Sequence, residues 1–88
     1  MPAICEFGGM KILIYFDDHD PPHLHIVGED KAEVNINYVE DGFYKAGKLP
    51  AKKERMIREW IDNFYVDIMN AWILCREFQA PGKIPPLY

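Results

Sequence analysis

The fold is decided by residues 47–79, which read GKLPAKKERMIREWIDNFYVDIMNAWILCREFQ, because the hydrophobic period changes within this stretch. After Pro50, apolar side chains recur at steps of three and four residues, the spacing of one face of a helix. These side chains are Met56, Ile57, Trp60, Ile61, Phe64, Ile68, Trp72, Cys75 and Phe78. Pro50 suits a first helical turn, and Pro81-Gly82 would stop the helix. We predict a helix over residues 50–79, which at about 45 Å either bends near Asp62-Asn63 or projects towards a partner.

Upstream of this helix the sequence predicts short strands separated by turns. Gly8-Gly9 between two apolar runs is a hairpin signal, and Pro21-Pro22 removes two donors from any ladder. The predicted strands span residues 3–7, 10–16, 22–27, 32–38 and 43–46. Because the connections are short, we expect an α+β fold: a meander of four to five antiparallel strands packed on one long C-terminal helix. The expected organisation is a single domain (1–88) made of a meander (1–47), a helix (50–79) and an extended tail (80–88).

The expected core lies between the sheet and the helix. It comprises Ile12, Ile14, Phe16, Val34, Ile36, Ile57, Trp60, Phe64, Ile68 and Trp72. The longest charge-free apolar run, residues 12–16, is far shorter than the roughly 20 residues of a membrane span, and the N-terminal residues lack the features of a signal peptide. The two cysteines lie far apart and form no CxxC pair, so we expect reduced thiols and a cytoplasmic protein that does not bind membranes.

Charge is distributed unevenly along the chain. The net charge is −4, but residues 1–44 carry nine acids and two bases, whereas residues 45–88 carry eight bases and five acids. The overall acidity argues against non-specific nucleic-acid binding. The basic segment predicts instead a surface for an acidic protein partner, and a solvated helix face is the alternative. Its candidate partner-binding residues are Lys48, Lys52, Lys53, Arg55 and Arg58.

All three histidines lie in one short segment, residues 17–25, which reads DDHDPPHLH. On a strand, His23 and His25 would point to the same face, where two imidazoles can share a metal ion or act as an acid–base pair. Asp18 or Asp20 would orient an imidazole by hydrogen bonding. The candidate metal ligands are His23, His25 and Asp18, a set that suits zinc and similar divalent ions, and the catalytic candidates are these three with His19. A structural turn with hydrogen-bonded histidines, or a partner-binding loop, would give the same pattern.

A family resemblance begins in this segment. Residues 18–26, DHDPPHLHI, resemble the Asp-His-x-Pro-Pro-His-x-His-Val signature of a bacterial family of unknown function, domain-of-unknown-function family 4160. The resemblance continues through residues 47–50 (GKLP), Trp60, Trp72 and residues 83–87 (KIPPL), and so covers nearly the whole chain. Many relatives carry a histidine where this chain has Phe64, so a mechanism that needs this fourth histidine is not implied here. The genes of the family often sit beside those of a second small family, numbered 2442, which resembles the layout of toxin–antitoxin modules.

Two interpretations of function, from different classes, remain open. The one we favour is a small cytosolic protein-interaction module, one half of a toxin–antitoxin-like two-gene system whose partner is the family 2442-like neighbour; a homodimer is also left open. The alternative is a histidine-based or metal-assisted hydrolase or ribonuclease that uses the His-x-His loop with a divalent metal such as zinc. The chain contains no serine or threonine, which excludes enzymes with those nucleophiles and leaves only Cys5 and Cys75 as thiol candidates.

Overall fold

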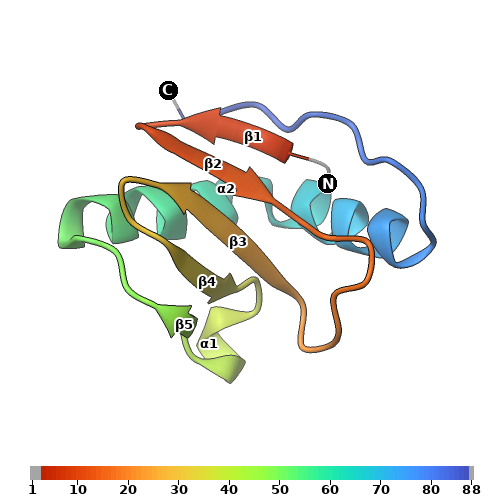
Figure 1. Ribbon diagram of the computed structural model, residues 1–88, viewed down its shortest axis with the longest axis horizontal. Helices are drawn as coiled ribbons and strands as arrows, with labels where there is room; N and C mark the ends of the chain where they lie inside the picture. The colour runs from red at the N-terminus through yellow and green to blue at the C-terminus, as the bar shows by residue number, and fades with distance from the viewer. Residues whose placement is uncertain (1–2, 88) are drawn as a thin grey trace.

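The computed structural model describes residues 3–87, which form a five-stranded antiparallel sheet with a long helix across one face (Figure 1). The strands, which follow one another in the sheet in sequence order, are β1 (Ala3–Phe7), β2 (Met10–Leu13), β3 (His23–Gly28), β4 (Ala32–Asn35) and β5 (Tyr44–Gly47). The helices are α1 (Tyr38–Asp41) and α2 (Ala51–Arg76). This arrangement confirms the predicted α+β class and the antiparallel meander. Met1, Pro2 and Tyr88, which belong to the predicted domain and tail, lie outside the described residues.

The first half of the sheet follows the predicted pattern, with one strand shorter than expected. Gly8 and Gly9 form the turn of the hairpin between β1 and β2. Their φ angles are positive, 58° and 76°, and residues with a Cβ rarely adopt such values. The prediction that β2 continues to residue 16 is wrong, because it ends at Leu13. The backbone N–H of Tyr15 donates to the Asp18 carboxylate at 3.0 Å, so the chain turns away from the ladder at this point.

The fourth predicted strand is also too long, since β4 ends at Asn35 instead of residue 38. The buried side-chain amide of Asn35 donates to the carbonyl oxygens of Asp41 and Gly42, at 3.3 and 2.8 Å. These bonds hold a tight turn that contains α1, a short helix which the alternating pattern up to Tyr38 did not indicate. The bounds of β3 and β5 each differ by about one residue from the prediction.

Helix α2 buries the apolar stripe that its period predicts. The predicted core residues that are at most 4% exposed are Ile12, Ile14, Val34, Ile36, Ile57, Trp60, Ile68 and Trp72. Two members of the predicted core, Phe16 and Phe64, are only partly buried. Phe16 follows the end of β2 in a loop, and Phe64 has non-helical φ and ψ of −123° and 27° at a bend in α2, directly after Asp62-Asn63. The helix ends at Arg76, three residues before the predicted end.

The segment after α2 returns along β1, as Figure 1 shows. The backbone N–H of Ile84 donates to the carbonyl of Ile4 at 2.8 Å, and the ammonium of Lys83 donates to the carbonyl of Ala3 at 2.9 Å. The buried indole N–H of Trp60 donates to the carbonyl of Pro85 at 2.9 Å, which ties this segment to the helix. No helix of residues 3–87 has the length and apolarity needed to cross a bilayer.

Candidate metal centre

Strand β3 presents its two histidines on one face of the sheet. Leu24 and Ile26 alternate with them and are fully buried in the core, whereas the rings of His23 and His25 lie side by side with centroids 5.1 Å apart. His23 is 3% exposed, and the side chain of His25 is 15% exposed. The alternation of the sequence therefore places both imidazoles together at the point where the loop of residues 14–22 meets β3.

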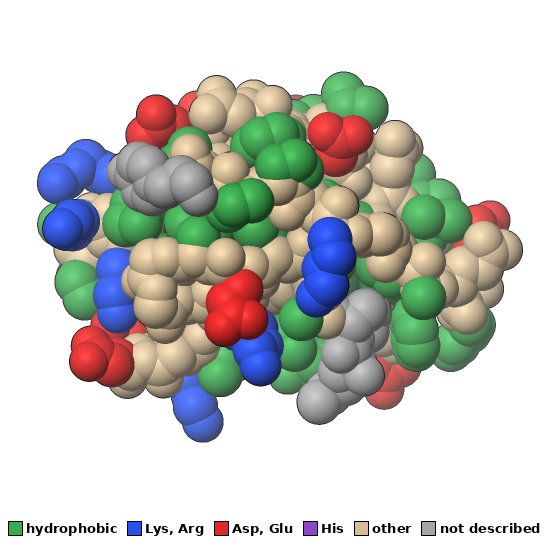
Figure 2. Space-filling view, turned by 90° about the horizontal axis from the view of Figure 1, so that it is seen from above, with side chains coloured by type: hydrophobic (Ala, Val, Ile, Leu, Met, Phe, Trp, Pro, Cys, Tyr) green, Lys and Arg blue, Asp and Glu red, His purple; other side chains and the backbone are tan. Residues whose placement is uncertain are grey.

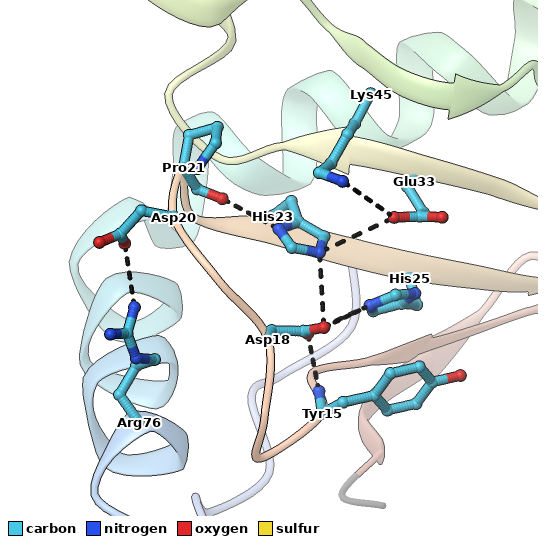
Figure 3. Close-up of polar contacts among 9 residues, drawn as sticks. All are labelled: Tyr15, Asp18, Asp20, Pro21, His23, His25, Glu33, Lys45 and Arg76. Carbon is cyan, nitrogen blue, oxygen red and sulfur yellow. Dashed lines mark hydrogen bonds and ion pairs between the residues drawn. The ribbon is translucent and has the colours of Figure 1, made fainter.

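Asp18 comes from this loop and completes the cluster (Figure 3). The Nε2 atom of His25 lies 3.1 Å from both carboxylate oxygens of Asp18, and the Nε2 atom of His23 lies 3.5 Å from Oδ1. One potential ligand atom from each of the three residues lies within 4.8 Å of the others. Asp18 is the aspartate within reach of an imidazole, whereas Asp20 points to α2 and pairs with Arg76 at 3.2 Å. The three predicted metal ligands are thus brought to one point.

The hydrogen bonds of His23 fix which ring nitrogen carries the hydrogen. Its Nδ1 atom lies 2.9 Å from the carbonyl oxygen of Pro21, which can only accept, so Nδ1 is the donor. In the neutral ring Nε2 then carries a lone pair, and this lone pair faces Asp18 at 3.5 Å and Glu33 at 3.8 Å. A buried lone pair opposite two carboxylates is unfavourable unless a cation lies between them. A divalent metal ion held by Nε2 and Asp18 would be such a cation.

Aromatic side chains hold both imidazoles in place. Tyr15 stacks on His25 with ring centroids 4.0 Å apart and an interplanar angle of 29°. The ring of Trp72, from the second half of α2, lies 5.4 Å from the ring of His23, and the guanidinium of Arg76 lies 5.9 Å from the ring of Trp72. The end of α2 therefore contacts the site both through Trp72 and through the Arg76–Asp20 ion pair.

Glu33 and Lys45 also belong to the site, although neither was among the predicted metal-binding, catalytic or partner-binding residues. Glu33 lies opposite His25 in the register of β3 and β4, and its carboxylate pairs with the ammonium of Lys45, from β5, at 3.7 Å. The signal that could have found them is the strand register, which places residues of three successive strands on one face. Together with residues 17–20, these side chains line an open depression of about 330 Å³ at the metal cluster.

The remaining catalytic candidates lie outside the three-residue cluster. His19 is exposed and lines the depression without being one of the converging ligand residues, so its catalytic role stays a prediction. Cys5 and Cys75 are buried free thiols. Burial raises the pKa of both thiols, and the negative charge of Asp18 further raises the pKa of Cys75. Both cysteines therefore favour the protonated form, which is the poorer nucleophile.

The predicted partner-binding residues divide into two groups. Lys53 pairs with Asp30 at 3.1 Å, and Arg58 pairs with Glu54 at 3.0 Å, so both are held by acids of the same chain. Lys48, Lys52 and Arg55 are exposed, and no ion pair links them to another residue within the range 3–87. Basic side chains gather at the end of the molecule where α2 begins (Figure 2). Trp60 and Trp72, at 0% and 4% exposure, are core residues and leave no indole on the surface as an interface anchor.

Comparison with protein families places the chain among relatives of unknown activity. The model of the family described as domain of unknown function (DUF4160) matches residues 9–73, which is well over half of the chain, so the chain belongs to this family. The match includes the whole histidine cluster and the first half and bend of α2. No curated protein and no solved structure showed significant similarity.

Proposed function

We propose that Asp18, His23 and His25 bind a divalent ion of the zinc class and that the protein is a metal-assisted hydrolase. The observation that supports this is the convergence of three ligand atoms within 4.8 Å, together with the orientation of the His23 lone pair towards carboxylates. The bond from Nδ1 of His23 to a backbone carbonyl is the usual way in which a metal-binding histidine is oriented. Two imidazoles and one carboxylate are ligands that zinc accepts.

A three-ligand site suits catalysis better than a structural role. Structural zinc sites use four protein ligands, whereas catalytic sites use three and keep one position for water. The cluster opens into the depression of about 330 Å³, which gives water and substrate access to that position. A bound zinc ion lowers the pKa of its water to about 7 and so supplies a nucleophile near neutral pH. In hydrolysis the water oxygen forms the new bond to the ester centre, the ester oxygen leaves with its electron pair, and the proton of the water passes to that oxygen.

Zinc titration of the full chain after removal of metal by a chelator tests the metal site. We expect one zinc ion per chain, with histidine NMR signals of His23 and His25 shifting while those of His19 stay in place. Affinity should fall below about pH 6, because ligating imidazoles must be deprotonated. If a tenfold excess of zinc gives neither heat of binding nor shifts of the histidine signals, the metal site is refuted and the loop is a structural turn with hydrogen-bonded histidines.

Substitutions separate ligands from neighbours. Asp18→Asn keeps the shape of the side chain but removes the charge, and His25→Ala removes a ligand at a position that is not fully buried. Each should weaken zinc binding by at least about tenfold, the lower limit seen even for outer-sphere partners of metal sites. His19→Ala is the matched control and should leave the zinc affinity unchanged, since His19 is exposed and is not one of the converging residues. Circular dichroism of each variant checks that it is folded.

A second candidate function is the interaction module, one half of a toxin–antitoxin-like pair. It is supported by three exposed cations at the start of α2 that have no ion pair within residues 3–87, Lys48, Lys52 and Arg55. Cations at a helix N-terminus are unfavourable because they oppose the helix dipole, so an acidic partner would stabilise them. We propose that this surface binds an acidic face of a family 2442-like neighbour protein. Co-purification of the two proteins should be lost in the Lys52→Glu/Arg55→Glu variant and kept in the Lys11→Glu control. If the double variant still co-purified with the neighbour protein, the proposal that this surface binds it would be refuted.

A further inference from the structure

A second, larger depression adjoins the candidate metal centre on the same face of the sheet. It has a volume of about 450 Å³, which lies within the range of small-molecule sites. His25 and Glu33 line both depressions, so the second one begins at the metal cluster and continues along β3, β4 and β5. The other lining residues are Tyr15, Ile26, Val27, Lys31, Ala32, Ala46 and Gly47. We call this second depression the β3–β5 groove.

Small side chains keep the groove open at its edge-strand side. Ala46 lies opposite Glu33 in the register of β4 and β5 and is exposed. Gly47 follows it with a positive φ of 70°, and its Cα packs so closely on the backbone of Lys31 and Ala32 that a Cβ would not fit. Tyr15 and His25, whose rings stack on each other, line the end of the groove next to the metal cluster. The groove thus offers aromatic side chains for contact with a planar group near the proposed metal.

The charges around the two depressions depend on whether a metal is bound. Four carboxylates line them, from Asp17, Asp18, Asp20 and Glu33. The basic side chains that line them are Lys31 and Lys45, and the charge of Asp20 is balanced by Arg76, which lines neither depression. With neutral histidines, Asp17, Asp18 and Glu33 against Lys31 and Lys45 leave one net negative charge, which a divalent cation changes to one net positive charge. An anion is therefore repelled from the metal-free site and attracted to the metal-loaded one.

We infer that the β3–β5 groove binds a small phosphoester with an aromatic or other planar leaving group, whose phosphoryl oxygens lie between the metal and Lys45 while Lys31 binds the far end of the anion. This inference rests on the proposed function, because it needs the metal. A single phosphoester fits better than a polynucleotide, since the chain as a whole carries a net charge of −4 and its carboxylates surround the site. Hydrolysis cleaves the bond from phosphorus to the leaving oxygen, and water supplies both the new oxygen on phosphorus and the proton on the leaving group.

Kinetics of the zinc-loaded full chain with bis(4-nitrophenyl) phosphate test the groove. Ala46→Leu fills the groove from an exposed position, and Lys31→Met removes a charge at its far end. Lys31→Met should raise KM by about tenfold, the loss expected for one charge-assisted contact. Ala46→Leu should raise KM by about tenfold or more, because the added side chain occupies the volume of the substrate. In both variants the zinc affinity should stay within about twofold of wild type. Lys11→Met is the matched control: it removes an exposed lysine that lies opposite Val27 in the β2–β3 register but lines neither depression, and its KM should not change. The neutral ester 4-nitrophenyl acetate should respond to Ala46→Leu and not to Lys31→Met.

The possible results separate the groove from the metal site. An unchanged KM in both groove variants, with zinc still bound, would overturn the groove and leave the metal site standing. Zinc binding without hydrolysis or measurable binding of the phosphoester would also overturn the groove. Failure to bind zinc would be seen independently in the titration, and it would overturn the proposed function together with the inference built on it. Cleavage of single-stranded RNA with a lower KM than the small ester would show that the substrate is a polynucleotide and refute the choice made here.

Discussion

Replacing Trp72 with alanine should greatly lower the thermal stability of the protein. Trp72 is 4% exposed, and the centre of its ring lies 5.4 Å from that of His23 and 5.9 Å from the guanidinium of Arg76. Truncating a buried tryptophan to alanine costs about 3–5 kcal/mol, because burial is lost and the cavity refills only in part. A chain of 88 residues has a total stability of roughly 4–13 kcal/mol at 0.05–0.15 kcal/mol per residue. The substitution therefore removes a large part of the free energy of unfolding.

Thermal unfolding followed by circular dichroism measures this loss. A domain of this size loses about 4–8 °C in Tm per kcal/mol, so we expect Tm to fall by at least about 12 °C. Ile73→Ala is the matched control, since Ile73 is the next residue on α2 and is 50% exposed; its Tm should change by only a few degrees. If Trp72→Ala melted within a degree or two of wild type, Trp72 would be a surface residue and the core described here would be incorrect. Zinc titration of Trp72→Phe, which keeps an aromatic ring beside His23, then shows whether this contact also supports the site.

Three further substitutions test local contacts. Tyr44→Phe removes a hydroxyl that accepts the backbone N–H of Leu49 at 3.0 Å and donates to Glu54 at 2.8 Å, so the free energy of unfolding in urea should fall by about 1–3 kcal/mol. The bonds from Tyr44 and Arg58 lower the pKa of Glu54 below its usual 4.5, so its stabilisation is present above that pH and lost as pH falls through the lowered value. The stability difference between wild type and Glu54→Gln should therefore shrink between about pH 5 and pH 3, and a constant difference would contradict this account. Gly47→Ala places a Cβ 2.4 Å from the carbonyl oxygen of Lys31 on a residue whose φ is 70°. The free energy of unfolding in urea should therefore fall by about 1–3 kcal/mol. Gly82→Ala is the control and should have little effect, because its Cβ would meet no atom within 4 Å.

The parts of the fold that the sequence predicted well depend on local signals. Gly8-Gly9 identified the first hairpin because positive φ favours glycine, and the change of period after Pro50 identified α2 because its apolar stripe packs on the sheet. The ends of β2 and β4 were predicted wrongly, in each case at a point where a side chain forms a hydrogen bond with the backbone of a residue several positions away. Asp18 ends β2 through the N–H of Tyr15, and Asn35 ends β4 through two carbonyls six and seven residues away. Apolar alternation continues past both points, so periodicity alone extends the strands too far.

The candidate site was predictable from the sequence only in its three ligand residues, His23, His25 and Asp18. That His23 and His25 share a face follows from the two-residue period of a strand, and Asp18 was one of two aspartates close enough in sequence to reach them. That Glu33 and Lys45 join the site could be predicted only from the register of three strands. That Trp72 and Arg76 join it depends on the packing of α2 near the loop of residues 14–22, which no local sequence pattern specifies.

The position of the site explains why it depends on both halves of the chain. The loop that carries Asp18 is held to α2 by the ion pair of Asp20 with Arg76, and His23 contacts the same helix through Trp72. Both contacts involve residues of the last two turns of α2, so the loop of Asp18 and the ring of His23 are positioned against the same part of the helix. Without Asp18, the two imidazoles alone would bind a metal more weakly than the three-ligand set.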